Sequence, residues 1–248
     1  MVGILSDVGN VREINEDSVG YYKAKDRSIY VIADGMGGHS AGEVASKVAV
    51  DLTIDYIKGL SNITDLKREI TIAVQKSNEE IFNLSRCRKN LSGMGTTITA
   101  CLISEGKAIV ANIGDSSCYI IDKNNKIKKI TKDHSLVQQL VDNGTITEEQ
   151  AKKHPNKNII TRALGTNKQI EVDAFDLNLK EIKNIILCTD GLTNDVDPEE
   201  ICEIVLNHTQ EDSCRLLIEC SKQRGGRDNI SVIVFEGECK DGRNFTRE

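Results

Sequence analysis

Short apolar runs bounded by turn residues recur along the chain and predict β-strands. The runs are Ser28–Ala33, Thr96–Ile103, Lys107–Ile113, Cys118–Ile121, Ile182–Thr189 and Ile230–Glu236. The link Ser104-Glu105-Gly106 between two of these runs predicts a hairpin turn, because glycine and short polar residues close such turns.

Longer segments carry their apolar residues at helical spacing. Ala41–Ile57 and Thr64–Cys87 each place a row of apolar side chains on one face, which predicts two long amphipathic helices. Start and stop signals predict further helices. One begins at Asp197-Pro198-Glu199-Glu200, two run over Ser213–Arg224 and Leu136–Asn143, and another opens with the capping box Thr147-Glu148-Glu149-Gln150.

The order of these elements favours an α+β fold. Strands come in runs and long helices in pairs, without strict βαβ alternation, so we expect mostly antiparallel sheets flanked by helices. The 248 residues contain two prolines, Pro155 and Pro198, and no internal repeat, so the pattern indicates one continuous domain.

Composition narrows the classes of function. The net charge is −6, aromatic residues make up 4% and tryptophan is absent, which argues against a nucleic-acid partner. No apolar run is long enough to span a membrane, and the N-terminus lacks the pattern of a signal peptide. The eight cysteines form no CxxC pair, and several lie in apolar runs, so we expect buried thiols in a reducing cytoplasm.

The strongest chemical signal is an aspartate beside glycine at the end of an apolar run, and it recurs at Asp34, Asp115, Asp190 and Asp228. Each such aspartate alone is better explained as an ordinary turn, as we interpret Asp241-Gly242. Gathered in one cleft, however, these carboxylates would repel one another without cations. Oxygen ligands of this kind suit Mg²⁺ or Mn²⁺, and two such ions can share a bridging aspartate.

Two further polar clusters fit the same chemistry. Arg12 precedes the acidic pair Glu16 and Asp17, and a guanidinium suits the oxygens of a phosphate, although the segment taken alone is better explained as a solvated charged strand or turn. In the loop after Asp34, the Gly35 carbonyl could bind a metal ion. His39 is either a proton donor or an ordinary loop histidine. No GxxxxGK[ST], HExxH or GxSxG motif is present.

Taken in order, these segments resemble the metal-dependent protein phosphatase (PPM, type 2C) family in its compact bacterial form. The matching stretches cover nearly the whole chain: Ser6-Asp7-Val8-Gly9, Asp34-Gly35-Met36-Gly37-Gly38-His39, Gly93-Met94-Gly95-Thr96-Thr97, Gly114-Asp115-Ser116, Asp133-His134-Ser135, Thr161-Arg162-Ala163-Leu164-Gly165, Thr189-Asp190-Gly191-Leu192 and Gly226-Arg227-Asp228-Asn229.

The resemblance implies a four-layer αββα sandwich of two mostly antiparallel sheets flanked by pairs of helices. It implies that a single catalytic domain covers residues 1–238, with a flap over about 134–166, and that 239–248 form a polar tail. It also implies a set of site residues: Asp34, Asp190 and Asp228 on one metal ion, Asp34 and the Gly35 carbonyl on the second, Asp115 and Asp190 on a weaker third, Arg12 on the phosphate, and Glu16 and Asp17 in the outer shell of the metals.

The activity implied is hydrolysis of phosphoserine and phosphothreonine in proteins, by in-line attack of a hydroxide that bridges two Mn²⁺ or Mg²⁺ ions. We expect a cytoplasmic monomer that opposes a serine/threonine protein kinase and binds neither nucleic acid nor membrane. Met36 stands where many eukaryotic relatives have a histidine proposed as the general acid, so the proton donor is open between His39 and a metal-bound water. Ser117 stands where members of the family often have an arginine, so the presence of a supporting ion pair is open too. A two-metal phosphodiesterase and an inactive phosphoprotein-binding regulator are the alternatives.

Overall fold

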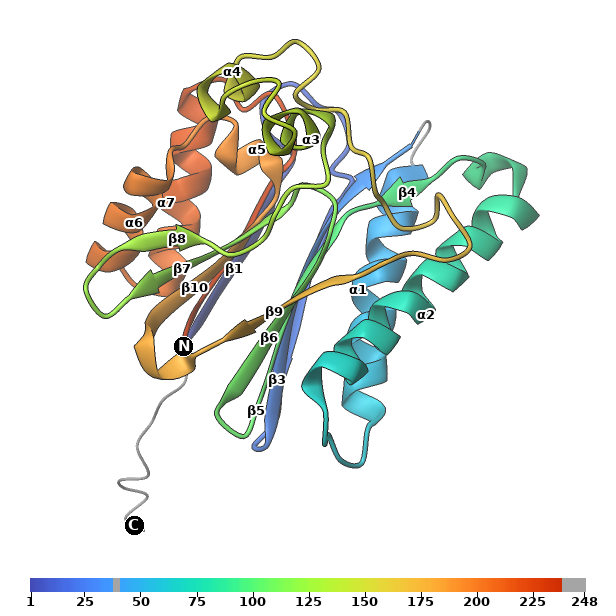
Figure 1. Ribbon diagram of the computed structural model, residues 1–248, viewed down its shortest axis with the longest axis horizontal. Coiled ribbons are helices and arrows are strands. Elements are labelled where there is room, and N and C mark those ends of the chain that lie inside the picture. Colours follow the sequence, from blue (N-terminus) through green and yellow to red (C-terminus); the bar gives the residue numbers. More distant parts are fainter. Residues whose placement is uncertain (38–40, 238–248) are drawn as a thin grey trace.

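The computed structural model describes residues 1–37 and 41–237. Its two antiparallel sheets lie face to face, with helices on both outer sides (Figure 1). One sheet has the order β1 (Val2–Asp7), β11 (Ile230–Glu236), β10 (Ile182–Cys188), β7 (Ser117–Asp122) and β8 (Ile127–Lys129). The other has the order β2 (Asp17–Lys23), β3 (Arg27–Met36), β5 (Ile98–Ser104), β6 (Lys107–Ile113) and β9 (Asp173–Leu177), with β4 (Gly95–Thr96) paired to β3.

The helices divide between the two outer faces and one end. Helices α1 (Ala41–Gly59) and α2 (Leu66–Cys87) cover the sheet that contains β3, whereas α6 (Pro198–Asn207) and α7 (Gln210–Gln223) cover the other (Figure 1). Helices α3 (Leu136–Asp142), α4 (Glu148–Lys152) and α5 (Asp190–Thr193) lie at the end where β3 leads to α1. Single 3₁₀ turns cover Lys89–Leu91 and Leu179–Glu181.

Alternation along the strands explains the layers. In β3, Ile29, Val31 and Ala33 pack into the core beneath α1 and α2. The intervening Tyr30 and Ile32 enter the core between the two sheets, where the rings of Tyr30 and Phe235 stack with centroids 3.7 Å apart. Successive side chains of a strand point to opposite faces, so a strand covered on both faces is a continuous apolar run.

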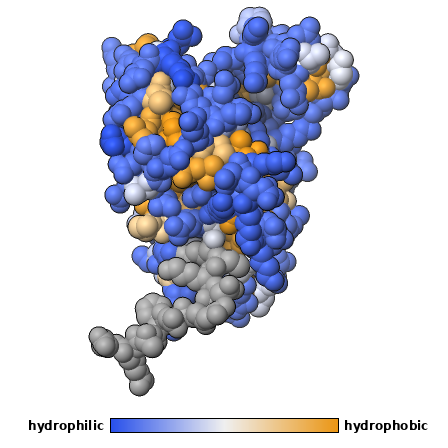
Figure 2. Space-filling view, turned by 90° about the vertical axis from the view of Figure 1, so that its left-hand side faces the viewer, coloured by the Kyte–Doolittle hydropathy of each residue, from blue (hydrophilic) through white to orange (hydrophobic). Residues whose placement is uncertain are grey.

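A third core lies between the other sheet and its helices, and it includes Leu192 of α5 and Leu217 of α7. Three apolar layers between four layers of secondary structure confirm the αββα sandwich. The face over α6 and α7 is largely hydrophilic, with hydrophobic side chains in small separate patches (Figure 2). Within the described ranges, no helix is both long and apolar enough to cross a membrane.

Several elements were not predicted from the sequence. Strands β1, β2, β8 and β9 and helix α5 are additions to the predicted set. The predicted strand Thr96–Ile103 is divided at Thr97 into β4 and β5, and Thr189 is the N-cap of α5 rather than a strand residue. Helix α7 begins before Ser213, because the hydroxyl of Thr209 caps its first turn by accepting a hydrogen bond from the Asp212 amide.

Candidate metal centre

The predicted aspartates meet at the end of the sandwich that carries α5. Asp34 lies near the end of β3, and Asp17 is its partner in the register of β2. Asp190 is the first residue of α5, Asp228 precedes β11, and Asp115 follows β6. The carboxyl groups of Asp34 and Asp190 lie close enough to shift each other's pKa. The tertiary structure therefore gathers the aspartates that the sequence separates.

Two threonines fix the backbone of Asp34. The amide of Asp34 donates to Thr97 Oγ1 at 2.9 Å, and its carbonyl accepts from Thr96 Oγ1 at 2.8 Å and from the Thr97 amide at 2.9 Å. These bonds satisfy the backbone of Asp34 where β3 passes from β5 to β4, so the carboxylate is presented from a rigid strand end.

Gly35 lies at the same strand end, and the packing there requires glycine. A Cβ atom at this position would collide with the carbonyl oxygens of Glu16 and Gly42. The Gly35 amide donates to the Glu16 carbonyl at 3.1 Å, which ties β3 to the segment before β2. The absence of a side chain thus lets α1 begin directly against the strand that carries Asp34.

Asp17 is buried, with 8% of its surface exposed, and one of its two carboxylate oxygens has hydrogen-bond partners. Its Oδ2 accepts hydrogen bonds from Ser231 Oγ at 2.6 Å and Thr189 Oγ1 at 2.9 Å. Its Oδ1 is buried without a hydrogen-bond partner, and so is Oδ1 of Asp115. Buried acceptors without partners cost free energy, and a cation is a natural partner for them.

Burial and mutual repulsion disturb the acid–base behaviour of the cluster. Burial, together with the neighbouring charge of Asp190, raises the pKa of Asp17 to about 7 and that of Asp115 to about 8. For the same reasons the pKa of Asp34 lies well above its usual range, and that of Asp190 is raised. Without a cation, the carboxyl groups of Asp17 and Asp115 are therefore partly protonated near neutral pH.

Arg12 and Glu16 lie at the margin of the cluster. The guanidinium of Arg12 donates from Nη2 to Asp228 Oδ2 at 3.0 Å, and about half of the Arg12 side chain is exposed. Burial raises the pKa of Glu16, whereas a hydrogen bond from the Gly42 backbone and the charge of Arg12 oppose this rise. Both residues therefore lie close to the aspartates, as the sequence predicted.

Asn229 holds the segments of the site together, and the sequence analysis used it only as part of a motif. Its Oδ1 accepts from the Glu16 amide at 2.9 Å, and its Nδ2 donates to the carbonyls of Val8 and Ile14, both at 3.0 Å. Thr189 and Ser231, which bind Asp17, were also missed as site residues. Their common signal is a polar side chain next to an apolar run.

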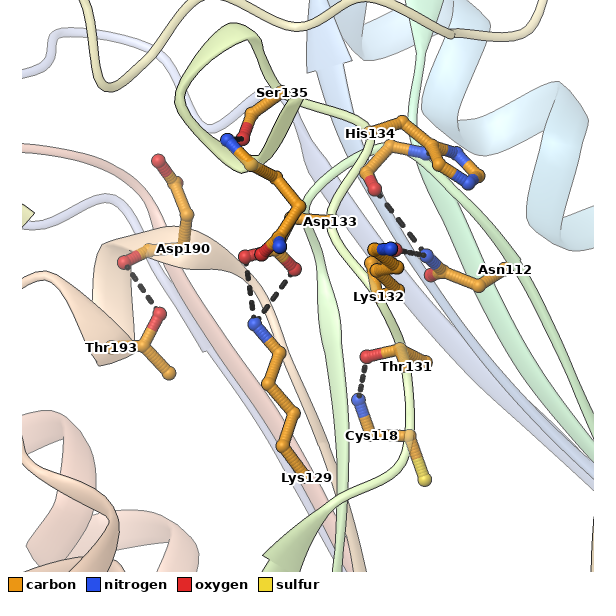
Figure 3. Close-up of polar contacts among 12 residues, drawn as sticks. Asn112, Cys118, Lys129, Thr131, Lys132, Asp133, His134, Ser135, Asp190 and Thr193 are labelled. Carbon is orange, nitrogen blue, oxygen red and sulfur yellow. Dashed lines mark hydrogen bonds and ion pairs between the residues drawn. The ribbon is translucent and has the colours of Figure 1, made fainter. Parts of the chain in front are cut away.

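A loop that enters the predicted flap contributes a second set of charges (Figure 3). Lys129 Nζ contacts both carboxylate oxygens of Asp133 at 2.7 Å. The next residue, His134, accepts the Gly114 amide on Nδ1 at 3.1 Å, and its Nε2 lies 3.2 Å from Asp173 Oδ2. Burial lowers the pKa of His134, so the ring is held in its neutral form beside the turn that carries Asp115.

The described side chains fit a divalent cation in chemistry but are not arranged as a finished coordination shell. Among residues 1–37 and 41–237, no three His, Cys, Asp or Glu side chains form a ready group for a metal ion. The hard oxygen donors, their mutual repulsion and the orphaned oxygens of Asp17 and Asp115 nevertheless suit such an ion. His39, which the sequence left open between a proton donor and an ordinary loop histidine, and the tail 239–248 lie outside the described residues.

Comparison with known proteins agrees with this arrangement. The family model for protein phosphatase 2C matches residues 10–229. The chain is 39% identical over 236 residues to a serine/threonine phosphatase, stp, of Listeria monocytogenes, with 93% of each chain covered. The crystal structure of the serine/threonine phosphatase Stp1 from Staphylococcus aureus is similar, with a TM-score of 0.89, 33% identity and coverage of 96% of this chain and 95% of that one.

A further solved structure, the catalytic domain of the serine/threonine protein phosphatase PstP in complex with two manganese ions, has a TM-score of 0.81 and 35% identity. The match covers 94% of this chain and 96% of the PstP chain. The αββα sandwich with aspartates gathered at one end is thus that of a PPM-type phosphatase. The chain belongs to the protein phosphatase 2C family, and it is an enzyme of the serine/threonine protein phosphatase class.

Proposed function

We propose that the chain removes phosphate from phosphoserine and phosphothreonine in proteins by in-line attack of hydroxide, with two divalent cations in the aspartate cluster. The observation that carries this proposal is the convergence of five aspartates whose carboxylates repel one another. They are Asp17, Asp34, Asp115, Asp190 and Asp228. Such a cluster is costly by itself and is explained by a bound charge of opposite sign.

In this proposal, Asp34, Asp190 and Asp228 hold one ion, Asp34 and the Gly35 carbonyl hold the second, and Asp115 with Asp190 holds a weaker third. Glu16 and Asp17 act from the outer shell through water. The two manganese ions in the PstP structure support a two-ion site, and Mn²⁺ or Mg²⁺ would suit the oxygen donors. Bound there, the ions would make hydroxide available from a bridging water at neutral pH and offset phosphate charge.

Arg12 is proposed to bind the substrate phosphate. Its guanidinium is a planar fork that matches two phosphate oxygens, and its half-exposed position leaves it accessible to a phosphorylated segment of another protein. The contact with Asp228 orients the guanidinium at the edge of the cluster, so the phosphate would lie between Arg12 and the metal site. A cytoplasmic monomer that opposes a serine/threonine kinase remains our expectation for its setting.

Asp190→Asn tests the metal assignment. The substitution keeps the shape of the side chain but removes a negative charge from the cluster, so we expect hydrolysis of a phosphothreonine peptide in Mn²⁺ to fall by about 100-fold or more. The matched control is Asp197→Asn, because Asp197 precedes the next helix, α6, as its N-cap residue and its side chain forms no capping hydrogen bond. Chelation should abolish turnover by the unmodified protein. Near-normal activity of the folded Asp190→Asn variant would contradict the assignment.

A further inference from the structure

The central part of the flap is weakly attached to the rest of the molecule. Neither α3 nor α4 contains a buried residue. The base of the flap is closed by backbone hydrogen bonds from the Leu136 amide to the Ile159 carbonyl at 2.8 Å and from the Thr161 amide to the His134 carbonyl at 2.7 Å. With so little buried apolar surface, the segment between these bonds opens at low free-energy cost unless side chains hold it.

One such side chain is Lys157. Its Nζ donates to Asn194 Oδ1, at the end of α5, at 2.6 Å. Residues 136–160 are all described, and among their hydrogen bonds and ion pairs this is the contact that reaches α5. The Lys157 side chain is partly buried, whereas the neighbouring Lys152 and Lys153 are exposed. Lys157 is thereby distinguished from the other flap lysines by its environment and by its partner.

Asn194 connects this lysine to the aspartate cluster. Its Nδ2 donates to Asp190 Oδ2 at 3.0 Å, and its backbone amide donates to the Asp190 carbonyl at 2.8 Å. An ammonium only donates hydrogen bonds and a carboxylate only accepts them, so the amide oxygen must face Lys157 and the amide nitrogen must face Asp190. Among uncharged side chains, a carboxamide suits this position because it offers both groups at one end.

We propose that Lys157 and Asn194 form a latch that holds the flap against α5 and orients the Asp190 carboxylate for its metal ion. This inference rests on the proposed function of Asp190. Both are positioning residues, because they act through Asp190 and touch neither the phosphate nor the metal ion. The latch couples the position of the flap to the orientation of the Asp190 carboxylate. When the flap lifts, the hydrogen bond between Lys157 and Asn194 breaks, and the carboxylate of Asp190 is less firmly oriented.

The first test is hydrogen exchange of residues 136–160 in the metal-free protein. Lys157→Met keeps the length of the side chain but removes the charged donor, so we expect exchange in this segment to quicken roughly 10-fold. Lys153→Met is the matched control, because Lys153 lies in the same segment and is exposed. Lys157→Arg should restore much of the protection. Equal exchange rates in Lys157→Met and Lys153→Met would overturn the latch.

The second test is Mn²⁺ affinity measured by calorimetry, without substrate. Asn194→Leu and Lys157→Met should each weaken binding, by about 10-fold for Asn194→Leu, as expected for the loss of an outer-shell contact. The double variant should bind Mn²⁺ no more weakly than Asn194→Leu alone, because both substitutions break one chain of contacts. Additive losses, or unchanged affinity in Asn194→Leu, would overturn the coupling. An unmodified protein that is inactive in Mn²⁺ would instead count against the proposed function, because the exchange result needs neither metal nor substrate.

Discussion

At the scale of single residues, Asn229 shows how much of the site depends on a side chain that does no chemistry. Its amide satisfies the Glu16 amide and the carbonyls of Val8 and Ile14, and only 5% of its surface is exposed. No backbone group of a neighbouring strand replaces these bonds, because the three segments meet outside the regular ladders.

We therefore expect Asn229→Ala to lower the free energy of unfolding by about 3 kcal/mol, since buried groups would lose their partners. Urea denaturation would measure this change. Asn207→Ala is the control, because Asn207 is exposed on α6 and makes a local bond to the Glu203 carbonyl. A loss no larger than that of the control would show that water replaces the Asn229 amide freely.

Arg12→Lys separates charge from geometry in the proposed phosphate site. Lysine keeps the positive charge but cannot present two parallel donors, so we expect kcat/KM for a phosphopeptide to fall roughly 10- to 100-fold. Steady-state kinetics would test this, with Arg86→Lys at the end of α2 as the control. If both variants hydrolyse the peptide at the same rate, Arg12 supplies only charge or does not contact the phosphate.

At the scale of elements, the packing of α1 against β3 and the segment before β2 depends on Gly35. The carbonyls of Glu16 and Gly42 occupy the space that a Cβ atom would need, and both belong to backbone that cannot rotate away. This close approach brings the beginning of α1 to the end of the strand that carries Asp34.

Gly35→Ala should therefore destabilise the fold by about 3 kcal/mol, which corresponds to a fall of roughly 6–12 °C in the melting temperature of a protein of this size. Thermal unfolding followed by circular dichroism would test the prediction. At Gly59, the last residue of α1, an added Cβ meets no atom within 4 Å, so Gly59→Ala is the control. Equal melting temperatures for the two variants would refute the packing argument.

At the scale of the whole molecule, the aspartate cluster links stability to pH and to metal. The folded protein retains a proton on Asp17 up to about pH 7 and on Asp115 up to about pH 8, whereas an unfolded chain releases both near pH 4. Between these values the folded state binds more protons than the unfolded state, so stability falls as the pH rises.

We expect the melting temperature of the metal-free protein to fall between pH 5 and pH 8, and Mn²⁺ to raise it most at pH 8, where the cluster is most charged. Asp17→Asn should flatten the pH dependence, because asparagine cannot ionise. Asp176→Asn, on the exposed edge of β9, should leave it unchanged. A metal-free protein that grows more stable from pH 5 to pH 8 would contradict the raised pKa values.

The apolar runs predicted all the central strands, which are β3, β5, β6, β7, β10 and β11. Side chains on both faces of these strands are buried, so each strand is a continuous apolar run in the sequence. The missed strands β1, β2, β8 and β9 are the edges of the two sheets. Their sequences mix polar and apolar residues, since one face or flank is exposed to water. Helix α5 has four residues, too few for a periodic pattern.

The sequence alone determined the central strands, the long helices and a mostly antiparallel sheet pair flanked by helices, because burial and local capping leave a pattern along the chain. Only the tertiary structure decided that Asp17 pairs with Asp34 in register, that Asn229 joins three segments, and that Lys157 reaches Asn194. These contacts join residues far apart in the chain. No local preference encodes them, and they form only when the packed sheets bring their strand ends together.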